Sequence, residues 1–244
     1  MKKTICIILI AAFVALLGTS TYFIIDHFQE EKEQAQMYGS LAQIVEKPET
    51  EPTEPIQYSE DAAILPELTE LYRQNSDLVG WVRVEDTNIN YPVMQTVDNP
   101  NFYLKHGFDK GYTDYGCPYV QEDCDVQAPS DNIVIYGHNM KNGSMFADLT
   151  KYRSLSFYRQ NPTLEFSTLY KKSTYKVYAV FVLNASKSDD NNYIYNISRK
   201  SFANDEDFES WSGEAYERSL INTGVDVNKN DNIITLVTCV YDFD

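Results

Sequence analysis

The sequence predicts a mainly β domain, a barrel or sandwich with short peripheral helices, preceded by an N-terminal transmembrane helix. Two observations support this prediction. From Gly80 onward, short runs rich in β-branched and aromatic residues alternate with turn residues, and few segments show helical periodicity. Near the start of the chain, the uncharged run from Ile5 to Ile25 is long and apolar enough to cross a bilayer as a helix.

The apolar run is typical of an uncleaved membrane anchor. Lys2 and Lys3 precede it and acidic residues follow it, which favours a cytoplasmic N-terminus with the remainder of the chain outside the cell. A cleaved signal peptide has a shorter apolar core and ends at a small-residue site, and this run fits neither feature. We therefore expect residues 1–25 to form a cytoplasmic tip and a single-pass anchor that binds the membrane.

The next segment is predicted to be a stalk. Residues 26–45 are rich in Glu, Gln and Ala, and they favour a helix that continues out of the membrane. Residues 46–61 place three prolines among acidic residues, a composition typical of an extended linker. We therefore assign residues 26–62 to an extracellular stalk and acidic linker, and residues 63–244 to the folded domain.

The folded domain is predicted to begin with a helix and to continue mainly as strands. Residues 66–75 show helical periodicity, with Pro66 acceptable in the first turn. Alternating or continuous apolar runs predict strands at 81–84, 89–93, 118–120, 132–136, 163–170, 173–184 and 232–238. Two further helices are expected at 145–152 and 205–220, the second capped by Asn204.

Two of these strands end next to a reactive side chain. Gly137 breaks one strand just before His138, and the run 232–238 leads directly to Cys239. Adjacent strands of one sheet can bring this imidazole and this thiol together. A neighbouring imidazolium favours the thiolate, which is the nucleophilic form of cysteine. The pattern predicts a thiol-based acyl-transfer site; the alternative is that Cys239 is an inert packing residue.

The composition argues against several other classes of protein. Lys and Arg number 20 against 36 Asp and Glu, and the net charge of −16 disfavours nucleic acid as a partner. The three histidines show no zinc-ligand spacing with the cysteines, and no nucleotide-binding glycine pattern is present, so we expect no metal and no cofactor. Cys117 and Cys124 either pair as a disulfide or remain thiols.

The segments Tyr136–Met140 and Thr235–Cys239 resemble the sortases, the cysteine transpeptidases of Gram-positive cell surfaces. The context from Met140 to Phe146 resembles class B in particular. The order of the two reactive residues agrees, because His precedes Cys in sortases, whereas papain-like and NlpC-type peptidases place Cys first. The resemblance extends from about Leu68 to the end of the chain. It implies that residues 63–244 form a sortase catalytic domain with the β-barrel fold of that family.

The resemblance also implies a reaction. Cys239 would attack the threonine carbonyl in a sorting motif of a secreted protein, so that the chain is cleaved after that threonine. His138 would protonate the departing amine. An amine of a peptidoglycan precursor or of a pilin would then accept the acyl group, which anchors the protein at the cell surface. The substrate groove would contain Asn99 and Leu104 on one side, Tyr193 and Ile194 on the other, and Val237 beside the cysteine.

Sortases carry an arginine on the strand that follows the catalytic cysteine. Here only Val240–Asp244 follow Cys239, and none of these residues is an arginine. We therefore expect the C-terminal strand of the domain to be missing. Arg199 and Arg218 lie upstream and match no family motif. Three alternatives stay open: an active transpeptidase, a cysteine endopeptidase that releases an acid, and an inactive relative that binds sorting peptides.

Overall fold

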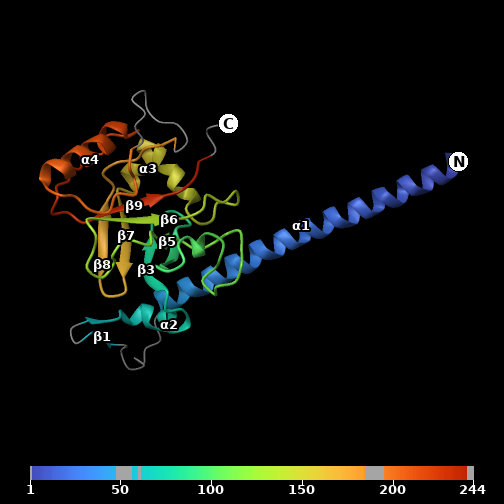
Figure 1. The fold of residues 1–244 in the computed structure, drawn as a ribbon, viewed down its shortest axis with the longest axis horizontal. Coiled ribbons are helices and arrows are strands. Elements are labelled where there is room, and N and C mark those ends of the chain that lie inside the picture. The colour runs from blue at the N-terminus through green and yellow to red at the C-terminus, as the bar shows by residue number, and fades with distance from the viewer. Residues whose placement is uncertain (1, 48–56, 60–61, 185–194, 241–244) are drawn as a thin grey trace. The chain divides into compact units, whose positions relative to one another are not determined.

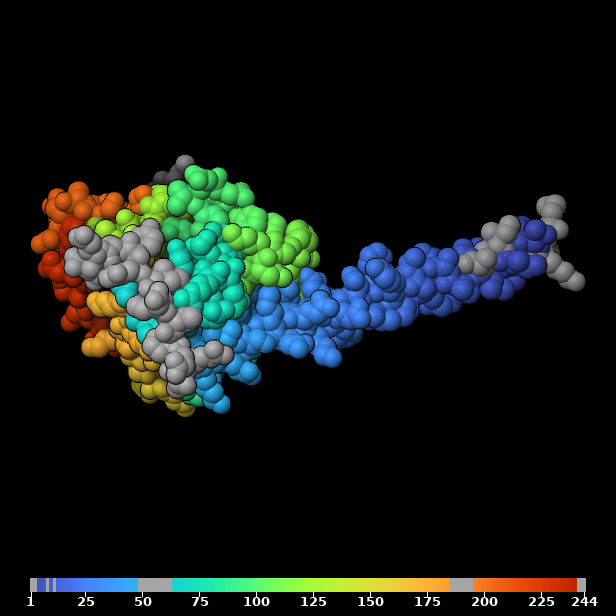
Figure 2. Space-filling view, turned by 90° about the horizontal axis from the view of Figure 1, so that it is seen from below, coloured from blue at the N-terminus to red at the C-terminus, as the bar shows by residue number. Residues whose placement is uncertain are grey.

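The computed structural model describes residues 2–47, 57–59, 62–184 and 195–240 (Figure 1). The chain divides into two units, Met1–Ser40 and Leu41–Asp244. The first unit lies within helix α1 (Lys2–Glu46), which confirms the predicted helix through residues 26–45. The apolar part of α1 has a mean hydropathy of 2.3, is unburied, and is long enough to cross a membrane. Figure 2 shows it in blue as a single helix with exposed side chains.

The second unit is mainly β. Its helices are α2 (Pro66–Gln74), η1 (Phe102–Leu104), η2 (Ala147–Arg153), α3 (Leu155–Gln160) and α4 (Asp205–Arg218), where η denotes a 3₁₀ helix. Its strands are β1 (Gln57–Ser59), β2 (Ala62–Ala63), β3 (Leu78–Arg83), β4 (Asn90–Met94), β5 (Tyr119–Val120), β6 (Asn132–Tyr136), β7 (Thr163–Thr168), β8 (Lys172–Lys176) and β9 (Ile233–Val237).

Seven strands form one sheet in the order β8-β7-β3-β4-β5-β6-β9, which curves into a nearly closed barrel. This confirms the predicted fold class. Most neighbours are antiparallel, but β4 pairs in parallel with β5 and β6 with β9, and β6 and β9 lie side by side (Figure 1). Strands β6 and β9 both consist largely of β-branched and aliphatic residues. The β6 side chains Ile133, Val134 and Ile135 are buried, as expected for a strand covered on both faces, whereas β9 is half-buried after Ile233.

Two predicted elements differ from the structure. The strand expected at 173–184 ends at Lys176, because the following segment bonds to the chain after α4. Leu220 N–H donates to the Val180 carbonyl, and the Thr223 hydroxyl donates to the Tyr178 carbonyl, both at 2.7 Å. The helix expected at 145–152 is instead the 3₁₀ helix η2, followed by α3. Met145 has a φ of 57°, which is incompatible with a helix beginning there.

Candidate active site

The register of β6 and β9 places the histidine and the cysteine beside each other. Tyr136 pairs with Val237, the last residues of the two strands. The pairing continues beyond them, since Gly137 N–H donates to the Val237 carbonyl (3.0 Å) and the Thr238 hydroxyl donates to the Gly137 carbonyl (2.8 Å). His138 and Cys239 follow in equivalent positions of two parallel neighbours, so both leave the sheet at the same edge.

A backbone carbonyl orients the imidazole of His138. Its Nε2 lies 2.7 Å from the carbonyl oxygen of Leu104, the last residue of η1. A carbonyl oxygen only accepts hydrogen bonds, so Nε2 carries the proton. Exchange of a proton with a thiol or an amine therefore belongs to Nδ1. The sequence predicted Leu104 as a groove residue, and the structure adds this contact through its backbone.

The backbone of Cys239 is held from the histidine side of the site. Asn139 donates from Nδ2 to the carbonyl oxygen of Cys239 at 2.8 Å. Cys239 itself is exposed, so a peptide can reach its sulfur. Asn139, directly after the histidine, thus fixes the backbone of Cys239. Sequence reasoning assigned Asn139 no role, although its position directly after His138 is a signal that could have pointed to it.

The loop that carries His138 is closed tightly on itself. Phe146 N–H donates to the His138 carbonyl (2.8 Å), and Asn139 forms an isolated bridge with Met145. Phe146 is fully buried, and its ring lies against Gly137, where a Cβ atom would stand 2.6 Å from the ring. A glycine is required at this position because the ring occupies the space of any side chain.

Two ionisable groups lie within electrostatic range of the candidate pair. A hydrogen bond from Lys105 holds the pKa of the Asp114 carboxyl below its ordinary value, and the nearby His138 acts in the same direction. Burial raises the pKa of Tyr119 to about 12, with smaller contributions from the nearby Tyr136, Glu122 and Cys239. Tyr119 therefore stays protonated at neutral pH, and its hydroxyl donates to Oδ1 of Asn101 at 2.9 Å.

Of the remaining predicted groove residues, Val237 and Asn99 lie in the described part of the chain. Val237 is half-buried at the end of β9, two residues before the cysteine. Asn99 is exposed at the turn that leads into η1, where its carbonyl accepts from the Thr96 hydroxyl (2.8 Å) and from Phe102 N–H (3.2 Å). The structure brings Leu104 to His138, but the bonds of Asn99 stay within its own turn. Tyr193 and Ile194 lie outside the described residues.

A segment from Tyr195 to Phe202 lies beside β6, with Ser198 at the end of that strand nearest the candidate pair and Phe202 at its start. The Ser198 hydroxyl lies 3.0 Å from that of Tyr136, and Ser198 carbonyl accepts from the Gln121 side chain (3.1 Å). Asn132 donates to the Arg199 carbonyl through its side chain (2.8 Å). This segment forms a wall beside the residue that precedes Gly137.

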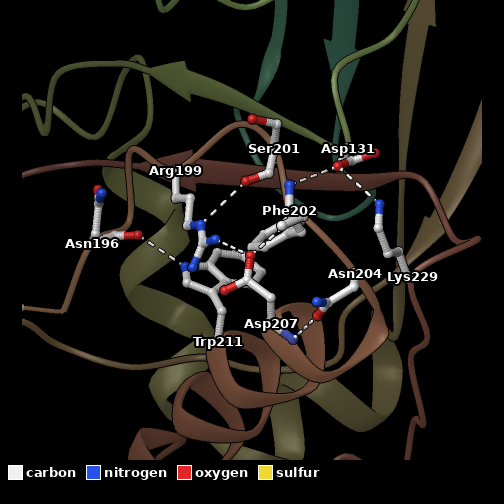
Figure 3. A network of polar contacts seen from close by, with 10 residues as sticks. Asp131, Asn196, Arg199, Ser201, Phe202, Asn204, Asp207, Trp211 and Lys229 are labelled. Atoms are coloured by element: carbon white, nitrogen blue, oxygen red, sulfur yellow. Dashed lines mark hydrogen bonds and ion pairs between the residues drawn. The ribbon is translucent and has the colours of Figure 1, made fainter.

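Helix α4 anchors the same segment from the other side (Figure 3). Trp211 donates from Nε1 to the Asn196 carbonyl (2.9 Å). Its ring also stacks on that of Tyr195, with centroids 5.8 Å apart. Arg199 pairs with Asp207 and lies over the Phe202 ring, 4.8 Å from its centroid. Asn204 caps the helix, as predicted, by accepting from the N–H of Asp207 (2.9 Å).

The upstream arginines are engaged away from the candidate pair. Arg199 belongs to the α4 network, and Arg218 pairs with Glu214 one turn earlier on the same helix, at 2.7 Å. The sulfur atoms of Cys117 and Cys124 are buried and lie 3.6 Å from the carbonyl oxygens of Pro92 and Asn132. Within the described residues these two cysteines do not form a disulfide, which decides between the two alternatives left by the sequence.

A sequence model of the Sortase domain family matches residues 82–244, which include β4 to β9 and both members of the candidate pair. The chain belongs to the sortase family. It is similar to sortase B of Staphylococcus aureus, with 28% identity over 97% of this chain and 88% of that protein. It is also similar to sortase B of Listeria monocytogenes, with 33% identity over 75% of this chain and 73% of that protein.

A solved structure gives the same result for the fold. The Staphylococcus aureus sortase B–substrate complex matches with a TM-score of 0.74 and 26% identity, and the match covers 88% of this chain and 92% of that one. These similarities support a class B sortase, a cysteine transpeptidase, with the barrel fold of that class. The fold, the class and the type of enzyme implied by the sequence resemblance are therefore confirmed.

Proposed function

We propose that this sortase is a membrane-anchored transpeptidase that cleaves a sorting motif of secreted proteins after threonine and transfers the acyl group to an amine of a peptidoglycan precursor or a pilin. The observation that carries the proposal is the register of β6 and β9, which delivers an exposed Cys239 and an oriented His138 to one edge of the barrel. The similarity to a sortase B that was solved with a substrate supports a peptide as the ligand.

In the first half-reaction, the Cys239 thiolate attacks the carbonyl carbon of the threonine. The bond to the following residue breaks as the His138 imidazolium gives its Nδ1 proton to the departing amine. The products are a thioester on Cys239, a released peptide with a new amino terminus, and a neutral imidazole. Because Leu104 holds Nε2, the ring keeps one orientation throughout this step.

In the second half-reaction, the neutral acceptor amine attacks the thioester carbonyl. Its surplus proton passes to Nδ1 of His138, the carbon–sulfur bond breaks, and the thiolate is restored beside an imidazolium. Water in place of the amine would give the endopeptidase alternative, with the same residues and a free acid as product. The choice between the two reactions lies in which nucleophile reaches the thioester.

We assign the peptide groove to the edge where η1 contacts His138 beyond the end of β6. Leu104 and Asn99 contribute one side, since Leu104 is 39% exposed and its carbonyl already lies at His138. Val237 lies in the floor next to the cysteine. Tyr193 and Ile194 are proposed for the opposite side, because the chain directly after them, Tyr195–Phe202, is held along β6. An extended peptide between these walls would present its threonine to Cys239.

A labelled sorting-motif library and a labelled amine test the proposal. The full chain in detergent micelles should join the two and form a thioester that mass spectrometry finds on Cys239. Cys239→Ala should abolish both, and His138→Ala should lower turnover by at least about 10²-fold, the usual size of general acid–base catalysis. Release of acid without amine transfer supports the endopeptidase alternative. Peptide binding without any thioester supports the inactive relative, and either result contradicts the proposal.

A further inference from the structure

The carbonyl that orients His138 lies close to a glycine in an unusual conformation. Gly116 has a φ of +60°, in the left-handed region that side chains rarely adopt. A Cβ atom at this position would stand 2.6 Å from the carbonyl oxygen of Tyr103 and 2.7 Å from that of Leu104. The backbone of Gly116 thus closes directly onto the acceptor that His138 uses.

Neither partner of this contact can move away easily. Cys117 N–H donates to the Tyr103 carbonyl (2.9 Å), and Thr113 N–H to the Lys105 carbonyl (3.0 Å), so the two stretches of chain are tied together on both sides of Leu104. A further anchor comes from the end of α2. The buried side chain of Asn75 donates to the Tyr103 hydroxyl at 2.8 Å, which ties η1 to the end of α2.

We propose that Gly116 is a positioning residue of the active site: by packing against the Leu104 carbonyl, it fixes the proton of His138 on Nε2 and leaves Nδ1 for the reaction. The proposal rests on the proposed function for its consequence on turnover. The chemical reason is that a neutral imidazole has two tautomers, and only the hydrogen bond of the far nitrogen selects one. A Cβ at residue 116 displaces the carbonyl, and the ring then loses both its orientation and its tautomer.

The structure offers a matched control. Gly224 has a φ of +65°, and an added Cβ there meets nothing within 4 Å. Gly116→Ala and Gly224→Ala therefore impose the same left-handed strain on an alanine, but only the first one pushes against the Leu104 carbonyl. Any difference between the two variants reports the contact and not the general intolerance of alanine for this conformation.

The experiment uses the full chain in detergent micelles, labelled with ¹⁵N in its histidines. ¹⁵N–¹H spectra, assigned with a His138→Gln variant, identify which nitrogen of His138 is protonated at a pH where the ring is neutral. Steady-state transfer of a sorting peptide to an amine gives kcat and KM. The Gly116→Ala change is measured alone and combined with His138→Ala, with Gly224→Ala beside it.

We expect the proton on Nε2 in the unsubstituted chain and a mixture of tautomers in Gly116→Ala. That variant should lose about 10²-fold in kcat, as for a misplacement of about 1 Å, with KM nearly unchanged. Gly224→Ala should keep its kcat, and Gly116→Ala should cause no further loss in the His138→Ala background.

Three results would overturn the proposal: a proton on Nδ1 in the unsubstituted chain, equal losses in the two glycine variants, or an undiminished loss when His138 is already absent. Should Gly116→Ala fail to fold, the tautomer of the unsubstituted chain decides alone. Failure of the proposed function has a different signature, because the unsubstituted chain would then transfer nothing while the spectra still report the state of His138.

Discussion

Asn139 links the two halves of the active site through one hydrogen bond, from its Nδ2 to the Cys239 carbonyl. The bond acts on the backbone, so it places the thiol without contacting the sulfur. Its geometry makes Asn139 a support for the nucleophile in the same way that Leu104 is a support for the histidine. Residues of this kind are expected to influence turnover more than peptide binding.

We predict that Asn139→Ala lowers kcat about tenfold, because the net value of one hydrogen bond is about 1 kcal/mol and a shifted thiol adds to that loss. The check is the rate of transfer together with the rate of Cys239 alkylation by iodoacetamide. Asn142→Ala is the control, since that side chain bonds Tyr115 and Ser144 in the same loop. Equal rates in the two variants would remove Asn139 from the site.

Gly137 gives a second prediction at the scale of single residues. Gly137→Ala should destabilise the domain by about 1–3 kcal/mol, because its Cβ would overlap the buried Phe146 ring. Gly213→Ala, in α4 with open space around it, should instead stabilise by about 0.5–1 kcal/mol through the helix preference of alanine. Urea unfolding of the detergent-solubilised chain measures both, and a neutral Gly137→Ala would contradict the packing described for this loop.

At the level of whole elements, α4 serves as the support of the Tyr195–Phe202 segment. Six buried residues from the segment, the helix and β9 form one cluster: Tyr195, Phe202, Phe208, Trp211, Ala215 and Ile233. Ile233 begins the strand that leads to the cysteine. The helix therefore stabilises both the wall along β6 and the first residue of the catalytic strand.

Trp211 is the side chain that joins these parts, and its replacement should be costly. Trp211→Ala is predicted to lose about 3–5 kcal/mol of stability, the range for a large buried aromatic residue. Trp211→Phe keeps most of the packing but removes the bond to the Asn196 carbonyl, so its loss should be about 1–2 kcal/mol. Guanidinium unfolding distinguishes the two, and similar losses would show that the hydrogen bond, not the packing, dominates.

How far the sequence predicted these elements depends on where their stability originates. The strands that end at Tyr136 and Val237 were predicted within one residue, because continuous β-branched runs with a glycine or a polar break are local signals. The strand expected to reach Asn184 was wrong beyond Lys176. Its alternating apolar residues, among them Ala179 and Phe181, pack against the α4 cluster instead of a neighbouring strand, and alternation alone cannot distinguish these partners.

The candidate site likewise has parts that the sequence predicted and parts that it did not. The reactive pair was evident from residue types and their positions after strands. The contact of His138 with the Leu104 carbonyl was not, because it joins groups 34 positions apart and uses a backbone atom that every residue possesses. Gly116 has no sequence signature for the same reason: its role depends on a conformation and on two carbonyls that only the folded loop brings near.

For the molecule as a whole, the apolar helix and its flanking charges predict an orientation. Lys2 and Lys3 precede the span and acidic residues follow it, so we expect the domain outside the cell. Protease added to intact protoplasts should remove the chain from Tyr58 onward and leave an anchored N-terminal fragment. Lysed protoplasts serve as the control for cleavage sites. A domain fully protected in intact protoplasts would reverse the proposed topology.

The parallel pairing of β6 with β9 also has a consequence for the order of folding. Asn139 and Cys239 are 100 positions apart in the chain, and parallel strands of such separation close late because a large loop must be ordered first. The histidine half of the site relies on contacts much nearer in sequence, such as that with Leu104. We therefore expect a folding chain to carry an oriented imidazole before it has a placed nucleophile. Thioester chemistry then begins only once the barrel is complete, which protects a newly made chain from acylating itself or its neighbours.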